Sequence, residues 1–278
     1  MTKVRDIMDT LEQLAPPPLA ESWDNCGLLI GNSSAEVGSV VLTLDITEAT
    51  RALAETMDAE LIITHHPVIF TPLTGINYDN PEQRLLLTLI QQRRSVYSAH
   101  TNLDSALGGV NDALMDALEF KADATLIPSD LEFERADLSI VRAVDPCVTW
   151  GLGRISTLSE PQLRFAIAAR VNNHLRTAGC FLNFDTDAEV KRVAVCGGSF
   201  DGGWIDRLVA ERVDLLISGE IKHHDLLAMK MRGIGAIAAG HDCTERVILP
   251  SLAGTLAEQF SDVKFAVDMG LNYNHIVL

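Results

Sequence analysis

The feature that most constrains the fold of this chain is the alternation of short apolar runs with longer stretches of helical periodicity. Apolar runs typical of strands lie at 40–45, 60–64, 95–99, 193–196, 214–218, 234–239 and 264–268. Helical patterns fall near 47–57, 81–93, 109–118, 202–212 and 244–258. Strand, helix, strand alternation is the pattern of βαβ units and of sheets that are at least partly parallel. The sequence therefore predicts an α/β protein.

The two ends of the chain resemble each other in the order of their elements. Each half shows strand, helix, strand, helix and strand, and each then carries a His-x-x-x-acid pair, His100 with Asp104 and His241 with Glu245. Matching patterns of this kind suggest an internal duplication. We expect two related α/β lobes with mixed or parallel sheets around a central metal cleft. The first lobe would span 1–120 and the second 191–278, with a connecting or edge segment at 121–190, all packed as one compact unit.

Composition limits the class of partner. The formal net charge is −16, and the chain offers no run of Lys and Arg that would attract a phosphate backbone. We therefore expect no nucleic-acid partner. The five cysteines are scattered without a C-x-x-C motif, which favours a reducing compartment. No apolar stretch approaches the roughly 18 residues of a membrane span, and the acid-containing N-terminal segment does not resemble a signal peptide. The expectation is a soluble cytoplasmic protein without a membrane partner.

Two adjacent histidines stand where a buried strand ends. The stretch "LIITHHPV" places His65 and His66 directly after the apolar run, with Pro67 following. At a strand end the alternation of side chains breaks down, so neighbours can reach the same crevice. Asp104, His241 and Glu245 each follow the carboxyl end of another expected strand. In open α/β sheets this edge is the usual ligand site.

Imidazole and carboxylate together suit zinc, manganese, iron or cobalt. Adjacent histidines do not easily share one ion, so two divalent ions bridged by a carboxylate form the simpler arrangement. We assign His65 and Asp104 to the first ion, His66 and His241 to the second, and Glu245 to both. Each of these sequence features also has an interpretation that involves no metal. The histidine pair could be hydrogen-bonded in the core, and His241 could precede a helix cap.

Other polar residues near the expected strand ends have less certain roles. Glu220 and His100 are candidate proton carriers, although Glu220 could also be a surface acid. His223 and His224 more simply begin a helix, and Cys243 is a small packing residue. Asp24 and Asn25 could cap a turn or line the cleft, with a structural role favoured. The glycine-rich segment 196–203 could receive an anion at a helix start, but it lacks the order of a nucleotide-binding motif.

With these residues assembled, the chain resembles the Nif-three-like family, whose bacterial members are often labelled GTP cyclohydrolase 1 type 2 homologues. The matching stretches are "AESWDNCGLLIG", "LIITHHPVIF", "SAHTNLDSALGGVND", "VAVCGGSF", "DLLISGEIKHHD" and "AAGHDCTER". The resemblance implies two lobes around a dinuclear metal centre held by His65, His66, Asp104, His241 and Glu245. It also implies a ring-shaped homohexamer, a trimer of dimers. The cysteine of "HDCTE" departs from many relatives.

Three functions follow from this reading. The first is a metal-dependent hydrolase or cyclohydrolase that uses a metal-activated water on a small-molecule substrate, with Glu220 or His100 carrying protons. Near the site only Arg246 and Lys222 supply positive charge, which argues against GTP as the substrate. The second is a metal carrier or chaperone, for example for iron delivery. The third is an oligomeric scaffold with structural metals.

Overall fold

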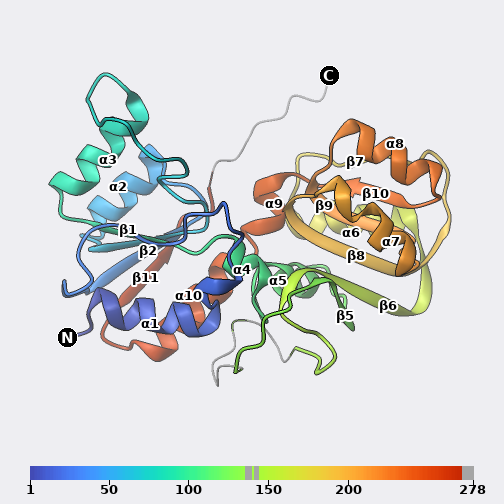
Figure 1. Ribbon diagram of the computed structural model, residues 1–278, viewed down its shortest axis with the longest axis horizontal. Coiled ribbons are helices and arrows are strands. Elements are labelled where there is room, and N and C mark those ends of the chain that lie inside the picture. The colour runs from blue at the N-terminus through green and yellow to red at the C-terminus, as the bar shows by residue number, and fades with distance from the viewer. Residues whose placement is uncertain (135–139, 141–143, 271–278) are drawn as a thin grey trace. The chain divides into compact units, whose positions relative to one another are not determined.

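The computed structural model describes residues 1–134, 140 and 144–270 (Figure 1). The described residues form two compact units. The first comprises Met1–Leu103 and Leu249–Gly270, and the second comprises the described residues of 104–248. Within the described residues, no helix combines the length and the apolar character needed to cross a membrane.

In the part of the chain that the structure describes, eleven strands form two sheets, and helices connect many of the strands. The helices are α1 (Val4–Leu14), α2 (Glu48–Thr56), α3 (Pro81–Gln91), α4 (Thr101–Ser105), α5 (Val110–Ala117), α6 (Arg164–Leu175), α7 (Ile205–Ala210), α8 (His223–Met231), α9 (His241–Glu245) and α10 (Ile248–Gln259), with 3-10 turns η1 (Pro17–Leu19) and η2 (Gly202–Trp204). The strands are β1 (Gly27–Ile30), β2 (Ser39–Thr43), β3 (Leu61–Thr64), β4 (Ser95–Ser98), β5 (Ala124–Pro128), β6 (Gly151–Leu163), β7 (Phe181–Leu182), β8 (Glu189–Ser199), β9 (Leu215–Glu220), β10 (Gly235–Ala238) and β11 (Lys264–Val267).

The sheet of the first unit has the order β1-β4-β3-β2-β11. Strands β4, β3, β2 and β11 run parallel, and β1 pairs antiparallel with β4. Every residue of β2, β3 and β4 is buried, as expected for parallel strands covered on both faces. The helices between these strands begin at clear caps, because Thr47 accepts from the amide of Thr50 and Asn80 accepts from that of Gln83.

The sheet of the second unit has the order β5-β6-β8-β9-β10-β7. Its centre is again a set of three parallel strands, β8, β9 and β10. Antiparallel strands flank this set, with β6 and β5 on one side and β7 on the other. Segment 121–190 therefore supplies three strands of this sheet. Apolar clusters pack on the strands, one with α5 and α6 and another with α7 and α8.

The two units repeat one order of elements. In the first, β2, α2, β3, α3, β4 and α4 follow one another, and in the second β8, α7, β9, α8, β10 and α9 do so. In each, three consecutive strands lie side by side and parallel. Each series ends in a short helix at the carboxyl end of its third strand. The prediction of an α/β protein with two related lobes is confirmed at the level of fold class.

The strand β11 joins the first sheet, although it follows the whole second unit in the chain. It pairs parallel with β2 from Lys264 to Val267. Two further contacts secure its end: the amide of Asp268 donates to the carbonyl oxygen of Leu42 at 2.8 Å, and Asp268 Oδ2 accepts from Thr50 Oγ1 at 2.7 Å. The first unit is therefore built from two separate stretches of sequence.

A buried ion pair joins β6 to α5 within the second unit. Arg154 on β6 is fully buried, and it contacts Asp112 on α5 through Nε at 2.9 Å and Nη2 at 2.8 Å. Its remaining N–H groups donate to the carbonyl oxygens of Ala106, Gly151 and Gly153. All five donors of the guanidinium thus have an acceptor, which offsets the large desolvation cost of burying it.

We predict that Arg154→Met destabilises the protein by roughly 3–5 kcal/mol, because it leaves the Asp112 carboxylate buried without its cation. Urea unfolding followed by tryptophan fluorescence measures the change, since Trp150 and Trp204 both belong to the second unit. Arg51→Met is the matched control, because Arg51 makes its ion pairs with the exposed acids Glu48 and Glu55. Equal stability of both variants would contradict the role given to the buried pair.

Candidate metal site

The sheet of the first unit positions His65 and His66. Both follow β3, which lies between β2 and β4 in the sheet. The amide of His65 donates to the carbonyl oxygen of Thr43, and that of His66 to Leu44, each at 3.0 Å. These bonds continue the ladder between β2 and β3 past the end of the strand. The two histidines are therefore held by main-chain hydrogen bonds at the carboxyl edge of the sheet.

Three imidazoles of the first unit are oriented by acceptors. The Nδ1 atom of His65 lies 2.8 Å from the carbonyl oxygen of Ala99, that of His66 lies 2.8 Å from Asp45 Oδ1, and that of His100 lies 2.9 Å from Asp24 Oδ1. Carbonyl and carboxylate oxygens only accept hydrogen bonds, so the proton of each neutral ring belongs on Nδ1. In each ring Nε2 then keeps its lone pair. This is the usual arrangement around a metal-binding histidine.

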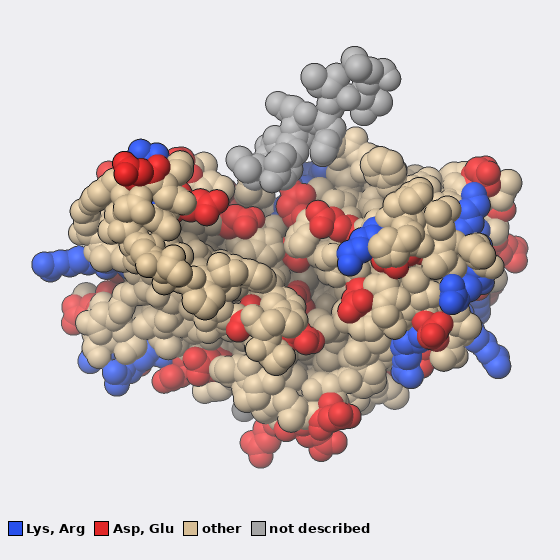
Figure 2. All heavy atoms as spheres, turned by 45° about the horizontal axis from the view of Figure 1, so that its top comes forward, with Lys and Arg blue, Asp and Glu red and all other residues tan. Residues whose placement is uncertain are grey.

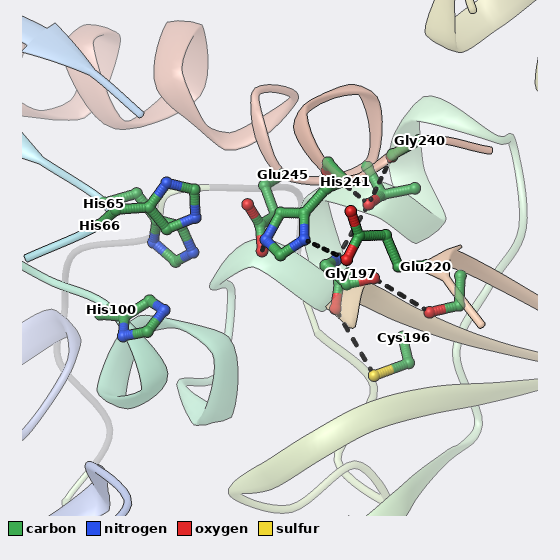
Figure 3. Close-up of polar contacts among 12 residues, drawn as sticks. His65, His66, His100, Cys196, Gly197, Glu220, Gly240, His241 and Glu245 are labelled. Atoms are coloured by element: carbon green, nitrogen blue, oxygen red, sulfur yellow. Dashed lines mark hydrogen bonds and ion pairs between the residues drawn. The ribbon is translucent and has the colours of Figure 1, made fainter. Parts of the chain in front are cut away.

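These three rings lie close together. One nitrogen of each lies within 4.8 Å of one nitrogen of the other two. The ring centroids are 5.1 Å apart for His65 and His66, 5.1 Å for His65 and His100, and 5.5 Å for His66 and His100. Figure 3 shows the three imidazoles gathered at the ends of their segments. The first unit thus brings together two predicted metal ligands and one predicted proton carrier.

Asp24, for which the sequence favoured a structural role, orients one of these imidazoles. Its carboxylate is fully buried beside His100. It accepts hydrogen bonds from the His100 ring, from the amide and hydroxyl of Thr101, from the thiol of Cys26 and from the amide of Asn25. Burial alone would raise the pKa of Asp24, but the bonds from His100, Thr101 and Cys26 together bring it well below its ordinary value. Asp24 therefore stays ionised and fixes the ring of His100.

In the second unit, the short helix α9 presents His241 and Glu245 on one face. The two residues are four positions apart, and His241 Nε2 lies 3.1 Å from Glu245 Oε1. Glu220, the last residue of β9, contacts the other ring nitrogen, with its Oε2 3.4 Å from His241 Nδ1 (Figure 3). Glu245 is buried, whereas the Glu220 side chain is 64% exposed. The two acids therefore face the two nitrogens of one imidazole.

Two glycines let α9 approach the ends of β8 and β9. A Cβ atom added to Gly198 would lie 2.1 Å from Glu245 Oε1 and 3.2 Å from His241 Nε2, and Gly198 has a φ of +63°. A Cβ at Gly219 would lie 2.8 Å from the Cα atom of His241. Thr244 secures the contact, because its hydroxyl accepts from the amide of Gly198 at 3.0 Å. The glycines of "CGGSF" and "ISGE" thus make room for the acid and the imidazole.

Asp104 also belongs to the second unit, and it lies near Glu245. One of its carboxylate oxygens is within 4.8 Å of one of Glu245. Burial raises the pKa of the Cys196 thiol, and the negative charges of Asp104 and Glu245 raise it further. Asn111 links the two sides of this region, donating to the carbonyl oxygen of Asp104 and accepting from the amide of Gly197, each at 2.9 Å. Two carboxylates so close together repel each other unless a cation or proton lies nearby.

The donor sets fit divalent transition metals. The first unit offers imidazole nitrogens whose protons are held on the far side of the ring, and the second offers two neighbouring carboxylates with one imidazole. Nitrogen and oxygen ligands of this mixture suit zinc, manganese, iron or cobalt. His65 and His66 are the residues of the first unit, and Asp104, His241 and Glu245 those of the second, that could hold an ion.

The remaining candidate residues have structural contacts. His223 and His224 begin α8, as expected, and belong to none of the possible metal-binding groups among the described residues. Cys243 packs in an apolar cluster. Arg246 donates to the carbonyl oxygens of Leu175 and Arg176 and to Asp242, so its charge serves the fold.

The glycine-rich segment at 196–203 has a carboxylate beside it. A Cβ atom at Gly202 would lie 2.2 Å from Asp225 Oδ1. Asp225 is buried, and its carboxylate stands where an anionic ligand would approach η2. The fold therefore gives no support to nucleotide binding at this segment.

Fold and site together define an α/β protein with clusters of histidine and acidic residues near its strand ends that could bind metal ions. Comparison with known proteins gives the family: the sequence model of Duf34/NIF3 (NGG1p interacting factor 3) matches residues 2–272, and the chain belongs to this family.

Relatives and solved structures agree with this assignment. The chain is 30% identical over 268 residues to a GTP cyclohydrolase 1 type 2 homolog of Clostridium perfringens, covering 95% of each protein. It is 32% identical to the protein NIF3 homolog of Schizosaccharomyces pombe, covering 85% of this chain and 82% of that one. A NIF3-related protein of Bacillus cereus has the same fold, with a TM-score of 0.88 at 22% identity over 100% of this chain and 99% of the other.

We predict that Gly198→Ala abolishes metal binding by the second unit. The added methyl group would displace Glu245 and His241, and alanine is strained at this positive φ. Metal content measured by mass spectrometry after loading and desalting reports the loss. Gly38→Ala is the control, because nothing lies within 4 Å of its added Cβ. Full metal content in Gly198→Ala would show that the close approach has no bearing on binding.

We predict that Asp24→Asn lowers the free energy of unfolding by roughly 1–3 kcal/mol at neutral pH, because an amide cannot accept from so many donors. Since the pKa of folded Asp24 lies below its ordinary value of 3.8, the stabilisation is complete above that pH and is lost as the pH falls toward the folded-state pKa. The difference between variant and wild type should therefore shrink in acid.

Denaturant titrations between neutral pH and about pH 3 measure this difference; their range brackets the ordinary pKa of Asp. Asp206→Asn is the control, since its side chain is 91% exposed. A difference that grew in acid would contradict the assignment of Asp24 as an ionised acceptor.

Proposed function

We propose that this protein holds two divalent metal ions and is a metal-dependent hydrolase that acts on a small molecule through a metal-activated water. His65 and Asp104 would hold the first ion, His66 and His241 the second, and Glu245 both. The observation that carries the proposal is the orientation of the imidazoles, since His65 and His66 have Nδ1 directed to an oxygen acceptor and Nε2 left as the ligand atom.

The charges of the second unit support the same conclusion. Asp104 and Glu245 lie near each other and near a buried thiol, where two negative charges are unfavourable without a cation. When bound, two such ions supply Lewis acidity and a water of lowered pKa.

Glu220 is the proposed proton acceptor. It lies 3.4 Å from His241 Nδ1, and its exposed side chain can exchange the proton with bulk water. His100 is the second candidate, with its ring fixed by Asp24.

The surface argues against a polyanionic substrate. The net charge is −16, and Arg246 is committed to main-chain carbonyls. Among the described residues visible in Figure 2, Lys and Arg side chains occur singly or in small groups rather than as one basic patch. We therefore propose a substrate with little negative charge, and not GTP itself.

The test combines metal analysis with a screen for turnover. Purified protein handled without chelator should contain about two ions per chain, and His66→Ala and Glu245→Ala should each reduce that number without unfolding the protein. The screen covers nucleotides, phosphodiesters and cyclic amides, with manganese, iron and zinc supplied in turn.

Glu220→Gln should keep both ions and lower turnover by about 100-fold or more, the usual contribution of a general base. Glu160→Gln, an exposed acid of β6, is the control and should change neither quantity. Well under one ion per chain in the wild type would refute the metal site. Full metal content with no turnover anywhere in the screen would favour a metal carrier instead.

We also propose that the protein works in the cytoplasm and assembles as a homohexamer, as the resemblance implies. Analytical ultracentrifugation of the wild-type chain measures the assembly directly.

A further inference from the structure

Two aromatic side chains of the first unit are exposed although they touch each other. Trp23 lies in the turn before β1, and Phe70 lies four residues after His66. Their exposed fractions are 57% and 53%, and their ring centroids are 5.8 Å apart with an interplanar angle of 47°. Fully burying a side chain such as Phe stabilises a protein by roughly 1.5–3 kcal/mol, so leaving two large rings in water forgoes a substantial contribution.

Both rings adjoin His100. The centroid of Trp23 lies 6.1 Å from that of His100 and the centroid of Phe70 lies 6.3 Å from it, with interplanar angles of 73° and 71°. These are edge-to-face contacts, which use part of each aromatic ring and leave other parts accessible. The exposed aromatic surface is therefore continuous with the three imidazoles of the first unit.

The backbone on either side of the two rings is held in place. Asn25 Nδ2 donates to the carbonyl oxygen of Ile69 at 2.6 Å, which ties the segment after Trp23 to the segment before Phe70. Asp24 is fixed by its bonds to His100 and Thr101. Trp23 and Phe70 are thus each next in sequence to a residue that hydrogen bonds hold in place. A preorganised aromatic pair of this kind loses little conformational entropy when a ligand binds.

Charge narrows the chemistry of that ligand. The charged side chains in contact with His66 and His100 are the carboxylates Asp45 and Asp24. Hydrogen bonds from His100, Thr101 and Cys26 keep Asp24 ionised despite its burial. In the metal-free protein, an anionic group beside the aromatic pair would meet these carboxylates, whereas a neutral or cationic ring would not meet like charge.

We propose that Trp23 and Phe70 form a stacking platform that binds a planar aromatic ring, neutral or cationic, next to His100. This deepens the proposed function, and it rests on that function in taking the ring to be part of the substrate. Ring stacking on an aromatic side chain contributes about 1–3 kcal/mol per base in nucleic-acid proteins, enough to select planar substrates.

The experiment uses three matched probes: inosine, which is a neutral purine nucleoside, ribose, which lacks the ring, and inosine triphosphate, which adds an anionic tail. Binding to the full chain is measured by NMR titration with and without prior chelator treatment. Inosine should bind and ribose should not, and in the chelator-treated protein inosine triphosphate should bind no more tightly than inosine.

Trp23→Ala should weaken inosine binding about tenfold, which corresponds to about 1.4 kcal/mol. Trp23→Phe should retain most of the affinity, because a planar ring remains. Phe181→Ala is the control, since Phe181 is an aromatic residue of the second unit that is 78% exposed. It should leave the affinity unchanged.

Three results would overturn the proposal: no inosine binding by the wild type, equal binding of ribose, or unchanged affinity in Trp23→Ala. A change of oligomeric state in Trp23→Ala without a change in affinity would show instead that a second copy of the chain covers the pair. Failure of the metal site is distinguishable, because chelator-treated protein would still bind inosine while containing no metal.

Discussion

The second unit depends on one buried guanidinium, that of Arg154, in which every N–H donor has a hydrogen-bond acceptor. Arg154 joins β6 to α5 through Asp112, and through Ala106 it also holds the chain between α4 and α5. This stretch follows directly after Asp104, and Asn111 in the next turn ties it to Gly197. Burying such a cation is unfavourable unless every donor is paired. The stretch that follows one candidate ligand is therefore held by an ion pair whose arginine is distant from it in sequence.

In the first unit the same principle operates through hydrogen-bond direction. His65 and His66 follow β3 and His100 follows β4, and their acceptors are Ala99 next to His100, Asp45 and Asp24. Each acceptor fixes both the plane of a ring and the nitrogen that carries its proton. The proton of each ring thus belongs on Nδ1, which is the tautomer that a metal-binding imidazole with Nε2 as its ligand atom requires. The exposed rings of Trp23 and Phe70 belong to the same hydrogen-bonded segments. The residues proposed for chemistry and those proposed for ring binding are therefore held by the same hydrogen bonds.

Much of this could be predicted from residue patterns. Apolar runs with intervening helical periodicity gave the α/β class, and the end of the run at 61–64 located His65 and His66 at a sheet edge. Residues that act by orienting another side chain could not be assigned that role from the sequence. Asp24 looks like any turn residue until folding brings His100 beside it, because the two are far apart in sequence. The pairing of β11 with β2 could not be predicted either, since a short apolar strand does not specify its partner across a whole intervening unit.

The place of β11 also has a consequence for synthesis on the ribosome. The parallel strands of the second unit, β8 to β10, all precede it in the chain, so that sheet can close while residues 264–267 are still inside the ribosomal tunnel. During this interval β2 presents an unpaired apolar border, every residue of which is buried in the finished protein. A chain that stopped before Lys264 would leave this border of β2 unpaired, and unpaired apolar strand edges promote association between chains.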